Sequence, residues 1–175
     1  MSAVAVPPVT LSTRLATSDD AAAIATIYNE GIADRIATFE TEPRTAAQIA
    51  AQIRDKGNRF PTVVAEQDGR IVAWAGAGPY RPRPAYAGVA EHSVYVARSA
   101  RGKGAGRAVL EALCRAYAER GFWKLVSRIF PENAASLALH ERCGFRVVGT
   151  YNRHGKLEGE WRDCVIVERL LAEPR

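Results

Sequence analysis

Long apolar runs are missing from this sequence of 175 residues. No stretch approaches the roughly 18 to 20 consecutive apolar residues that a membrane helix needs. The opening residues, MSAVAVPPVTLS, also lack the basic segment and the long apolar segment of a secretion signal. We therefore expect a cytoplasmic protein without a membrane partner.

Cysteine is also scarce. The three cysteines, Cys114, Cys143 and Cys164, are widely spaced, each lies in an apolar or periodic stretch, and no CxxC pair occurs. An odd number at these spacings does not suggest a disulfide framework or a metal site. We predict buried, reduced thiols and no bound metal.

Clustered positive charge is the third absence. The formal net charge is +5, but the basic residues are scattered, with no lysine-rich tail and no interleaved aromatic platform. Nucleic acid is therefore not an expected partner. A phosphate-bearing small molecule would need only a few of these cations.

The composition suits one compact domain, with 47% hydrophobic and 25% charged residues. We predict a poorly ordered arm over residues 1–12, which contain Pro7 and Pro8, and a folded domain over residues 13–175. A short strand is expected at residues 14–17.

Apolar periodicity predicts the order of the later elements. Helical spacing marks residues 21–32, ending near Gly31, and residues 45–56, with a loop between them. Asp68 and Gly69 lie between two β-branched runs and predict a hairpin. Strands then follow at 90–97, 124–130, 145–151 and 161–170, with helices before and after the second of them. The order predicts an α/β fold, a mixed and mostly antiparallel central sheet flanked by helices.

The stretch SVYVARSARGKGAGRAVL leads from a strand through a basic glycine-rich turn into a helix. Glycines allow backbone N–H groups to approach a ligand, and a helix N-terminus attracts anions. The Lys-Ser/Thr pair of a Walker loop is missing, and Arg107 stands where a dinucleotide fingerprint needs Gly or Ala. A pyrophosphate site is the functional interpretation, and a ligand-free turn is the alternative.

RGKGAG resembles the acetyl-CoA loop of the GNAT superfamily of N-acetyltransferases, and PENAASLALHERCGF resembles its later cofactor segment. Within the superfamily, TFETEPRT, GPYRPRPAY, AEHSVYV, LHERCGF and GEWRDC are similar to strings of phosphinothricin acetyltransferases. The resemblance implies a single GNAT-like domain, a homodimer, and acetyl-CoA as cosubstrate. The residues it assigns to acetyl-CoA are Val94, Tyr95, Val96, Arg101, Gly102, Lys103, Gly104, Ala105, Gly106, Arg107, Asn133 and Ser136.

Acetyl transfer to an amine needs a base for the ammonium proton and an acid for the departing thiolate. The resemblance assigns the base to Glu91, at the head of the strand entering the glycine loop; a solvated strand-end carboxylate is the alternative. His140 stands where many members of the superfamily have a tyrosine acid. It is predicted to approach the cofactor as the acid or as a binding residue, and a structural histidine is the alternative.

Substrate contacts are predicted in two loops, at Phe39, Arg81, Arg83 and Tyr86. Arginine presents a planar fork that matches carboxylates and similar oxyanions. The predicted function is acetylation of a small anionic amino acid of the phosphinothricin, arsinothricin or methionine sulfoximine type, for resistance or detoxification. The alternatives are an acetyl-CoA sensory domain without transfer and an N-acetyltransferase for peptides or ribosomal proteins.

Overall fold

The turn at Asp68 and Gly69 joins β2 (Val63–Gln67) to β3 (Arg70–Pro79) in the computed structural model, which describes residues 10–171. Both turn residues have positive φ, 52° and 73°. Tight hairpin turns of this type match the right-handed twist of the two strands. The predicted hairpin is therefore confirmed, and β4 (Val89–Val96) pairs antiparallel with β3 on its other side.

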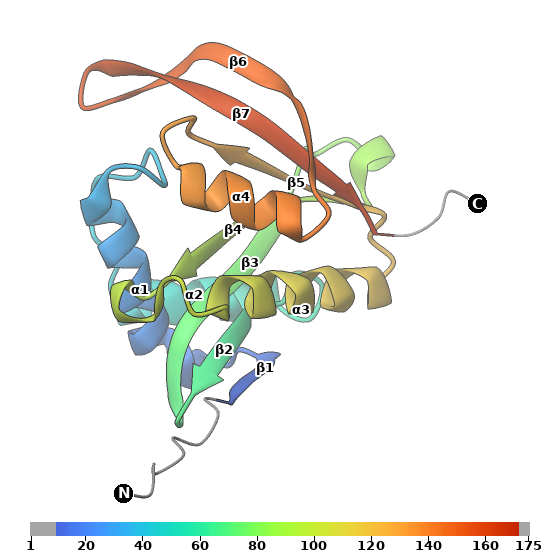
Figure 1. Cartoon of the computed structure of the whole chain (residues 1–175). Helices are drawn as coiled ribbons and strands as arrows, with labels where there is room; N and C mark the ends of the chain where they lie inside the picture. Colours follow the sequence, from blue (N-terminus) through green and yellow to red (C-terminus); the bar gives the residue numbers. More distant parts are fainter. Residues whose placement is uncertain (1–9, 172–175) are drawn as a thin grey trace, which may run out of the picture.

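Seven strands form one sheet in the order β1-β2-β3-β4-β5-β7-β6 (Figure 1). The remaining strands are β1 (Leu11–Leu15), β5 (Lys124–Ile129), β6 (Arg146–Leu157) and β7 (Glu160–Leu170). Among the described strands, β4 and β5 form the one parallel pair. This confirms the predicted mixed and mostly antiparallel sheet.

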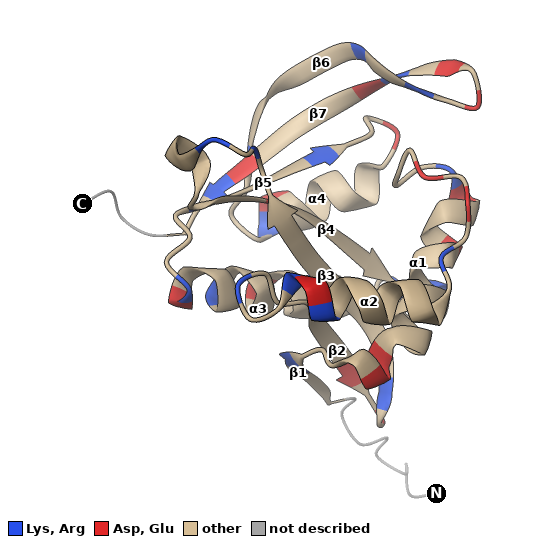
Figure 2. Ribbon diagram, turned by 180° about the vertical axis from the view of Figure 1, so that it is seen from behind, with Lys and Arg blue, Asp and Glu red and all other residues tan. Residues whose placement is uncertain are grey.

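Helices cover both faces of the sheet. Helices α3 (Ala105–Glu119) and α4 (Ala134–Arg142) lie in front of it in Figure 1, and α1 (Ala21–Asp34) and α2 (Ala46–Lys56) are seen from the other side in Figure 2. Strand β2 alternates between the two cores, since Val64 packs with α1 and α2 whereas Val63 and Ala65 pack with α3. Within residues 10–171, no helix is long and apolar enough to cross a bilayer.

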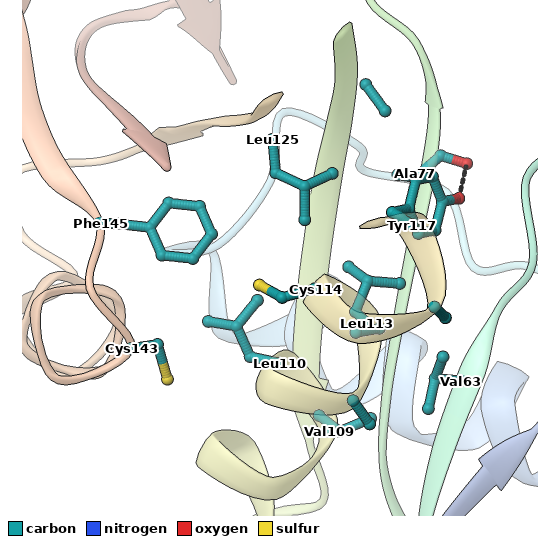
Figure 3. Close-up of a cluster of buried hydrophobic side chains, with 14 of the residues drawn as sticks. Val63, Ala77, Val109, Leu110, Leu113, Cys114, Tyr117, Leu125, Cys143 and Phe145 are labelled. Atoms are coloured by element: carbon teal, nitrogen blue, oxygen red, sulfur yellow. Dashed lines mark hydrogen bonds between the residues drawn. The ribbon is translucent and has the colours of Figure 1, made fainter. Parts of the chain in front are cut away.

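The larger core lies under α3 (Figure 3). The apolar residues Val109, Leu110, Leu113 and Cys114 on this helix are buried. The Tyr117 hydroxyl donates toward the carbonyl oxygens of Ala77 at 3.3 Å and Pro61 at 3.2 Å. A hydroxyl with buried acceptors costs less to bury than an unpaired one. All three cysteines are buried and free, as predicted.

Three of the boundaries predicted by residue number differ from the structure by three residues or more, and the others agree within two. Strand β1 begins at Leu11, three residues before the expected strand, whereas residues 1–9 of the predicted arm lie outside the described part. Helix α1 continues through Gly31 to Asp34, because Gly31 allows close packing rather than a helix end: a Cβ there would lie 2.6 Å from Cδ1 of Tyr95. Strand β6 extends to Leu157, beyond the expected residue 151.

Candidate active site

Strands β4 and β5 separate after a short ladder. Their parallel pairing covers three residue pairs and ends at Glu91 opposite Val126. Beyond this point the β4 edge around Val94–Val96 shares a cavity with α4 instead of pairing with β5. Strand separation therefore opens the sheet just past Glu91.

The cavity at this opening has a volume of about 390 Å³. Ten of the twelve residues predicted to bind acetyl-CoA line it: Val94, Tyr95, Val96, Arg101, Gly102, Gly104, Gly106, Arg107, Asn133 and Ser136. Lys103 and Ala105 do not line it. The ammonium of Lys103 donates to the carbonyl oxygen of Ser99 at 2.9 Å, and Ala105 is buried.

The glycine loop turns sharply into the N-terminus of α3. Gly102 and Gly104 have φ of 75° and 87°, a region that other residues rarely adopt, and Gly104 is the N-cap of the helix. Gly106 lies where α3 approaches α4, since a Cβ there would be 3.1 Å from Cδ2 of Leu139. Free N–H groups at this helix end and its dipole favour a bound anion such as a pyrophosphate.

Asp34, at the end of α1, holds the basic side of this cavity in place. Its carboxylate bonds Arg98 at 2.6 Å and Arg101 at 2.8 Å. The Arg98 hydrogen bond, followed by that of Arg101, lowers the pKa of Asp34. Arg101 is therefore oriented before any ligand binds, at the cost of partly neutralising its charge.

His140 does not line the cavity. It is 1% exposed, its Nδ1 donates to the carbonyl oxygen of Ser136 at 2.7 Å, and its Nε2 lies 2.9 Å from Nε2 of His92. His92 and Glu91 are neighbours on a strand, so their side chains point to opposite faces of the sheet. His140 therefore lies on the face of β4 opposite the predicted base.

The two histidines can be assigned tautomers. A carbonyl only accepts, so Nδ1 of His140 carries a proton and, in the neutral ring, Nε2 accepts from Nε2 of His92. Nδ1 of His92 is then a bare acceptor, and it is buried with no hydrogen bond of standard geometry to any group within residues 10–171. Burial, followed by the charge of His140, lowers the pKa of His92 to about 3, and burial also lowers that of His140.

The buried pair predicts a pH-dependent stability. With its pKa lowered from 6.5 to about 3, His92 is neutral in the folded state while the unfolded chain takes up a proton, so stability is complete above pH 6.5 and falls as the pH drops toward 3. At pH 5 the loss from His92 should be about 2 kcal/mol. Urea unfolding at pH 7.5 and pH 5 measures it.

A His92→Gln variant should show a smaller drop between these two pH values than the wild type. His154, exposed on β6, supplies the control, since His154→Gln should keep the wild-type drop. An equal drop in all three proteins would contradict the assigned protonation of His92.

A second, smaller cavity of about 170 Å³ contains Glu91. Arg81, also predicted from sequence, lines it, with its guanidinium 5.2 Å from the ring centre of Tyr80. Arg128 lines it as well and contacts one carboxylate oxygen of Glu91, Oε1, at 2.7 Å through Nε and at 2.5 Å through Nη2. A carboxylate and two arginines therefore share one small space.

The other three predicted substrate residues, Phe39, Arg83 and Tyr86, do not line this cavity. The ring centres of Tyr86 and Tyr80 are 5.7 Å apart, and Phe39 packs against Phe130 at 4.8 Å. Arg83 is exposed and precedes a short 3₁₀ turn. The structure thus brings Glu91 and Arg81 together but leaves Arg83 outside.

A family model described as the acetyltransferase (GNAT) family matches residues 24–145. The chain belongs to the GNAT family. This membership confirms acetyl transfer as the activity and acetyl-CoA as the cosubstrate, as predicted.

Three relatives show where this GNAT acetyltransferase falls within the family. It is 38% identical to a phosphinothricin N-acetyltransferase of Alcaligenes faecalis over 90% of this chain and 81% of that protein. It is 32% identical to an L-methionine sulfoximine/L-methionine sulfone acetyltransferase of Pseudomonas aeruginosa, over 89% and 92% of the two chains. A phosphinothricin acetyltransferase from Sinorhizobium meliloti, solved in complex with acetyl-CoA, matches with a TM-score of 0.85 and 33% identity over 92% and 88%. These identities of 32–38% confirm the resemblance to the phosphinothricin acetyltransferase group. They support a small amino-acid-like substrate.

The sequence interpretation missed several cavity residues of this acetyltransferase. The larger cavity also includes Asp34 and Arg142, and the smaller includes Arg128, Tyr151 and His154. Arg128 could have been identified from the sequence, because it is the one charged residue inside the apolar strand segment LVSRIF. No local sequence pattern indicates Asp34, since its partners Arg98 and Arg101 lie more than 60 residues away along the chain.

Proposed function

We propose that this GNAT enzyme acetylates the α-amine of a small amino acid, either an anionic one of the phosphinothricin or arsinothricin type or its uncharged analogue of the methionine sulfoximine type. The observation that carries the proposal is the shared cavity of Glu91 and Arg81, beside the opening of the sheet. A base for the amine and a cation for an anionic group are the two functions that such an acceptor needs.

In this proposal Glu91 takes the ammonium proton. Arg128 contacts only Oε1 of its carboxylate, which leaves Oε2 to accept the proton directly or through a water molecule. The neutral nitrogen then attacks the thioester carbonyl carbon and the carbon–sulfur bond breaks. The second proton that the nitrogen loses as it becomes an amide is taken up by the departing thiolate, which leaves as CoA. We assign no proton transfer to His140, because both its ring nitrogens are engaged inside the protein.

The larger cavity is proposed as the acetyl-CoA site. The N–H groups at the start of α3, with Arg101 and Arg107, suit the pyrophosphate. On the side that faces β5, no described strand pairs with β4 around Val94–Val96, so the backbone groups there can bond the amide-bearing arm of the cofactor. Asn133 and Ser136 lie across the cavity, where the Asn133 side chain accepts from the Ser136 N–H at 3.1 Å and caps α4.

Arg81 is proposed to bind the anionic side chain of the acceptor, with Arg83 as a second cation at the loop surface. A guanidinium matches phosphinate and arsinate oxygens in a two-point contact. Phe39 and Tyr86 support this loop region through Phe130 and Tyr80. Acetylation removes the charge of the amine, and this change is the basis for proposing detoxification or resistance as the role.

A cytoplasmic homodimer is proposed as the working form. Exposed apolar side chains on β6 and β7 support a contact between two copies, since Val147, Tyr151 and Trp161 are 59%, 53% and 54% exposed. Apolar side chains grouped on one strand pair are typical of an interface. Acetyl-CoA itself is a cytoplasmic metabolite, which supports the proposed location.

An acceptor screen tests the function. The enzyme is incubated with acetyl-CoA and one acceptor at a time, and released CoA is followed with a thiol dye. We expect release with phosphinothricin, arsinothricin, and L-methionine sulfoximine or sulfone, and much less with a peptide that begins with alanine. Release with the peptide alone, or acetyl-CoA binding without release for any acceptor, would contradict the proposal.

A further inference from the structure

Arg128 faces the same cavity as the predicted base. It follows Val126 by two residues on β5, and alternate residues of a strand share a face, so both side chains line the smaller cavity. Its neighbours Ser127 and Ile129 point to the other side and are buried. The guanidinium is 48% exposed at the side chain, which leaves it accessible to a small ligand.

Its bonds to Glu91 use only part of the guanidinium. Nε donates a hydrogen bond to Oε1 of Glu91, Nη2 lies within ion-pair distance of the same oxygen, and Nη1 has no hydrogen-bond partner within residues 10–171. An arginine has five N–H donors in a fixed plane and can bond two carboxylates at once. Arg128 can therefore hold Glu91 and still offer donors to a second anion.

The covalent geometry of an amino acid indicates which of its anionic groups, the α-carboxylate or the side chain, can reach Arg128. In an α-amino acid the carboxyl carbon is two bonds from the nitrogen, at about 2.5 Å. When the amine approaches Glu91, the α-carboxylate must lie beside it, whereas an anionic side chain ends several bonds further away. Arg128 touches Glu91 directly and Arg81 does not, so the two cations correspond to the near and the far anion.

We propose that Arg128 binds the α-carboxylate of the acceptor and selects free α-amino acids. This inference rests on the proposed function and assigns one part of the substrate to a residue that is not among those predicted from the sequence. The arriving zwitterion adds two ion pairs to the existing Arg128–Glu91 pair: its ammonium pairs with Glu91 and its carboxylate pairs with Arg128. An amino acid amide or the first residue of a peptide lacks the second pairing, because its α-carboxyl group carries no charge.

The test compares L-methionine sulfone with its α-carboxamide, two acceptors that differ in the α-carboxylate. The wild type should prefer the acid. Arg128→Gln should lower kcat/KM for the acid by roughly 10- to 150-fold, the range expected for one charged hydrogen-bonded contact, mainly through KM. The amide should change less than about 3-fold, since it never made that contact.

Two further variants keep the result interpretable. Arg128→Lys retains the charge and should restore part of the preference for the acid. Arg146→Gln removes an exposed arginine that pairs with Glu168 on the neighbouring strand and lines neither cavity, so it should keep wild-type preference. Thermal unfolding of each variant checks that it folds.

Equal losses on acid and amide would overturn the inference, because Arg128 would then act only by orienting Glu91. An unchanged preference in Arg128→Gln would overturn it as well. Either outcome leaves the proposed function standing, because the wild type still acetylates amino acids. If the wild type acetylates neither methionine sulfone nor any other amino acid, the proposed function itself fails, and this inference fails with it.

Discussion

Replacing Glu91 with Gln should lower kcat by about 10²- to 10⁴-fold, the range expected when a general base is removed. Gln keeps the shape of the side chain and can still accept from Arg128, but its amide cannot take up the ammonium proton. Affinity for acetyl-CoA should stay within about 3-fold of wild type, since Glu91 does not line the larger cavity. Steady-state kinetics and calorimetry measure the two effects separately.

The matched control is Glu132→Gln, which removes a carboxylate 3.7 Å from Arg162 and outside both cavities. It should leave kcat unchanged. Wild-type turnover with a wild-type pH profile in Glu91→Gln would show that another group, or bulk water, accepts the proton.

Replacing Arg81 with Gln should lower kcat/KM for phosphinothricin by roughly 10- to 150-fold, the loss expected when one charged hydrogen-bonded contact is removed. Arg81 lines the cavity of Glu91, so its guanidinium is placed to meet an anionic side chain while the amine is near the base. L-Methionine sulfone has an uncharged side chain and should be affected much less. The comparison of the two acceptors in wild type and variant measures this selectivity.

Arg83→Gln distinguishes the contributions of the two loop arginines to kcat/KM, because Arg83 is exposed and lines neither cavity. It should reduce kcat/KM for phosphinothricin less than Arg81→Gln does. Equal losses on charged and uncharged acceptors in Arg81→Gln would contradict a role in recognising the side chain and would point to loop packing on Tyr80 instead.

Local patterns predicted most of the fold. Alternation, helical spacing and the Asp68–Gly69 turn depend on residues close in sequence, and the elements they indicated are present. The glycine loop was predictable for the same reason, because Gly102 and Gly104 mark backbone that other residues rarely adopt. The order of the elements along the chain followed from the same local patterns, and it supported the family resemblance.

Contacts between distant segments were not predictable in this way. Nothing in the local sequence shows that the β4–β5 ladder stops at Glu91, or that Arg128, 37 residues later, bonds its carboxylate. Gly31 was interpreted as a helix end because glycine is common there, although its actual role is contact with Tyr95. Such roles depend on the tertiary partner.

His140 shows the limit of transferring a role by position. Its place on α4, seven residues after Asn133, suggested an approach to the cofactor, and the helix does line the larger cavity through other residues. The imidazole instead turns to His92 on β4. Because adjacent strand residues face opposite sides, a group that packs on His92 is separated from Glu91 by the sheet.

The acetylated product is the most direct test of the central claim, which is acetyl transfer to the α-amine of an anionic amino acid. The enzyme is incubated with acetyl-CoA and phosphinothricin, and mass spectrometry with NMR identifies the product and the acetylated atom. We predict N-acetylphosphinothricin, modified at the α-nitrogen, in a one-to-one ratio with free CoA. Bound acetyl-CoA with no acetylated phosphinothricin, arsinothricin or methionine sulfoximine would contradict the account.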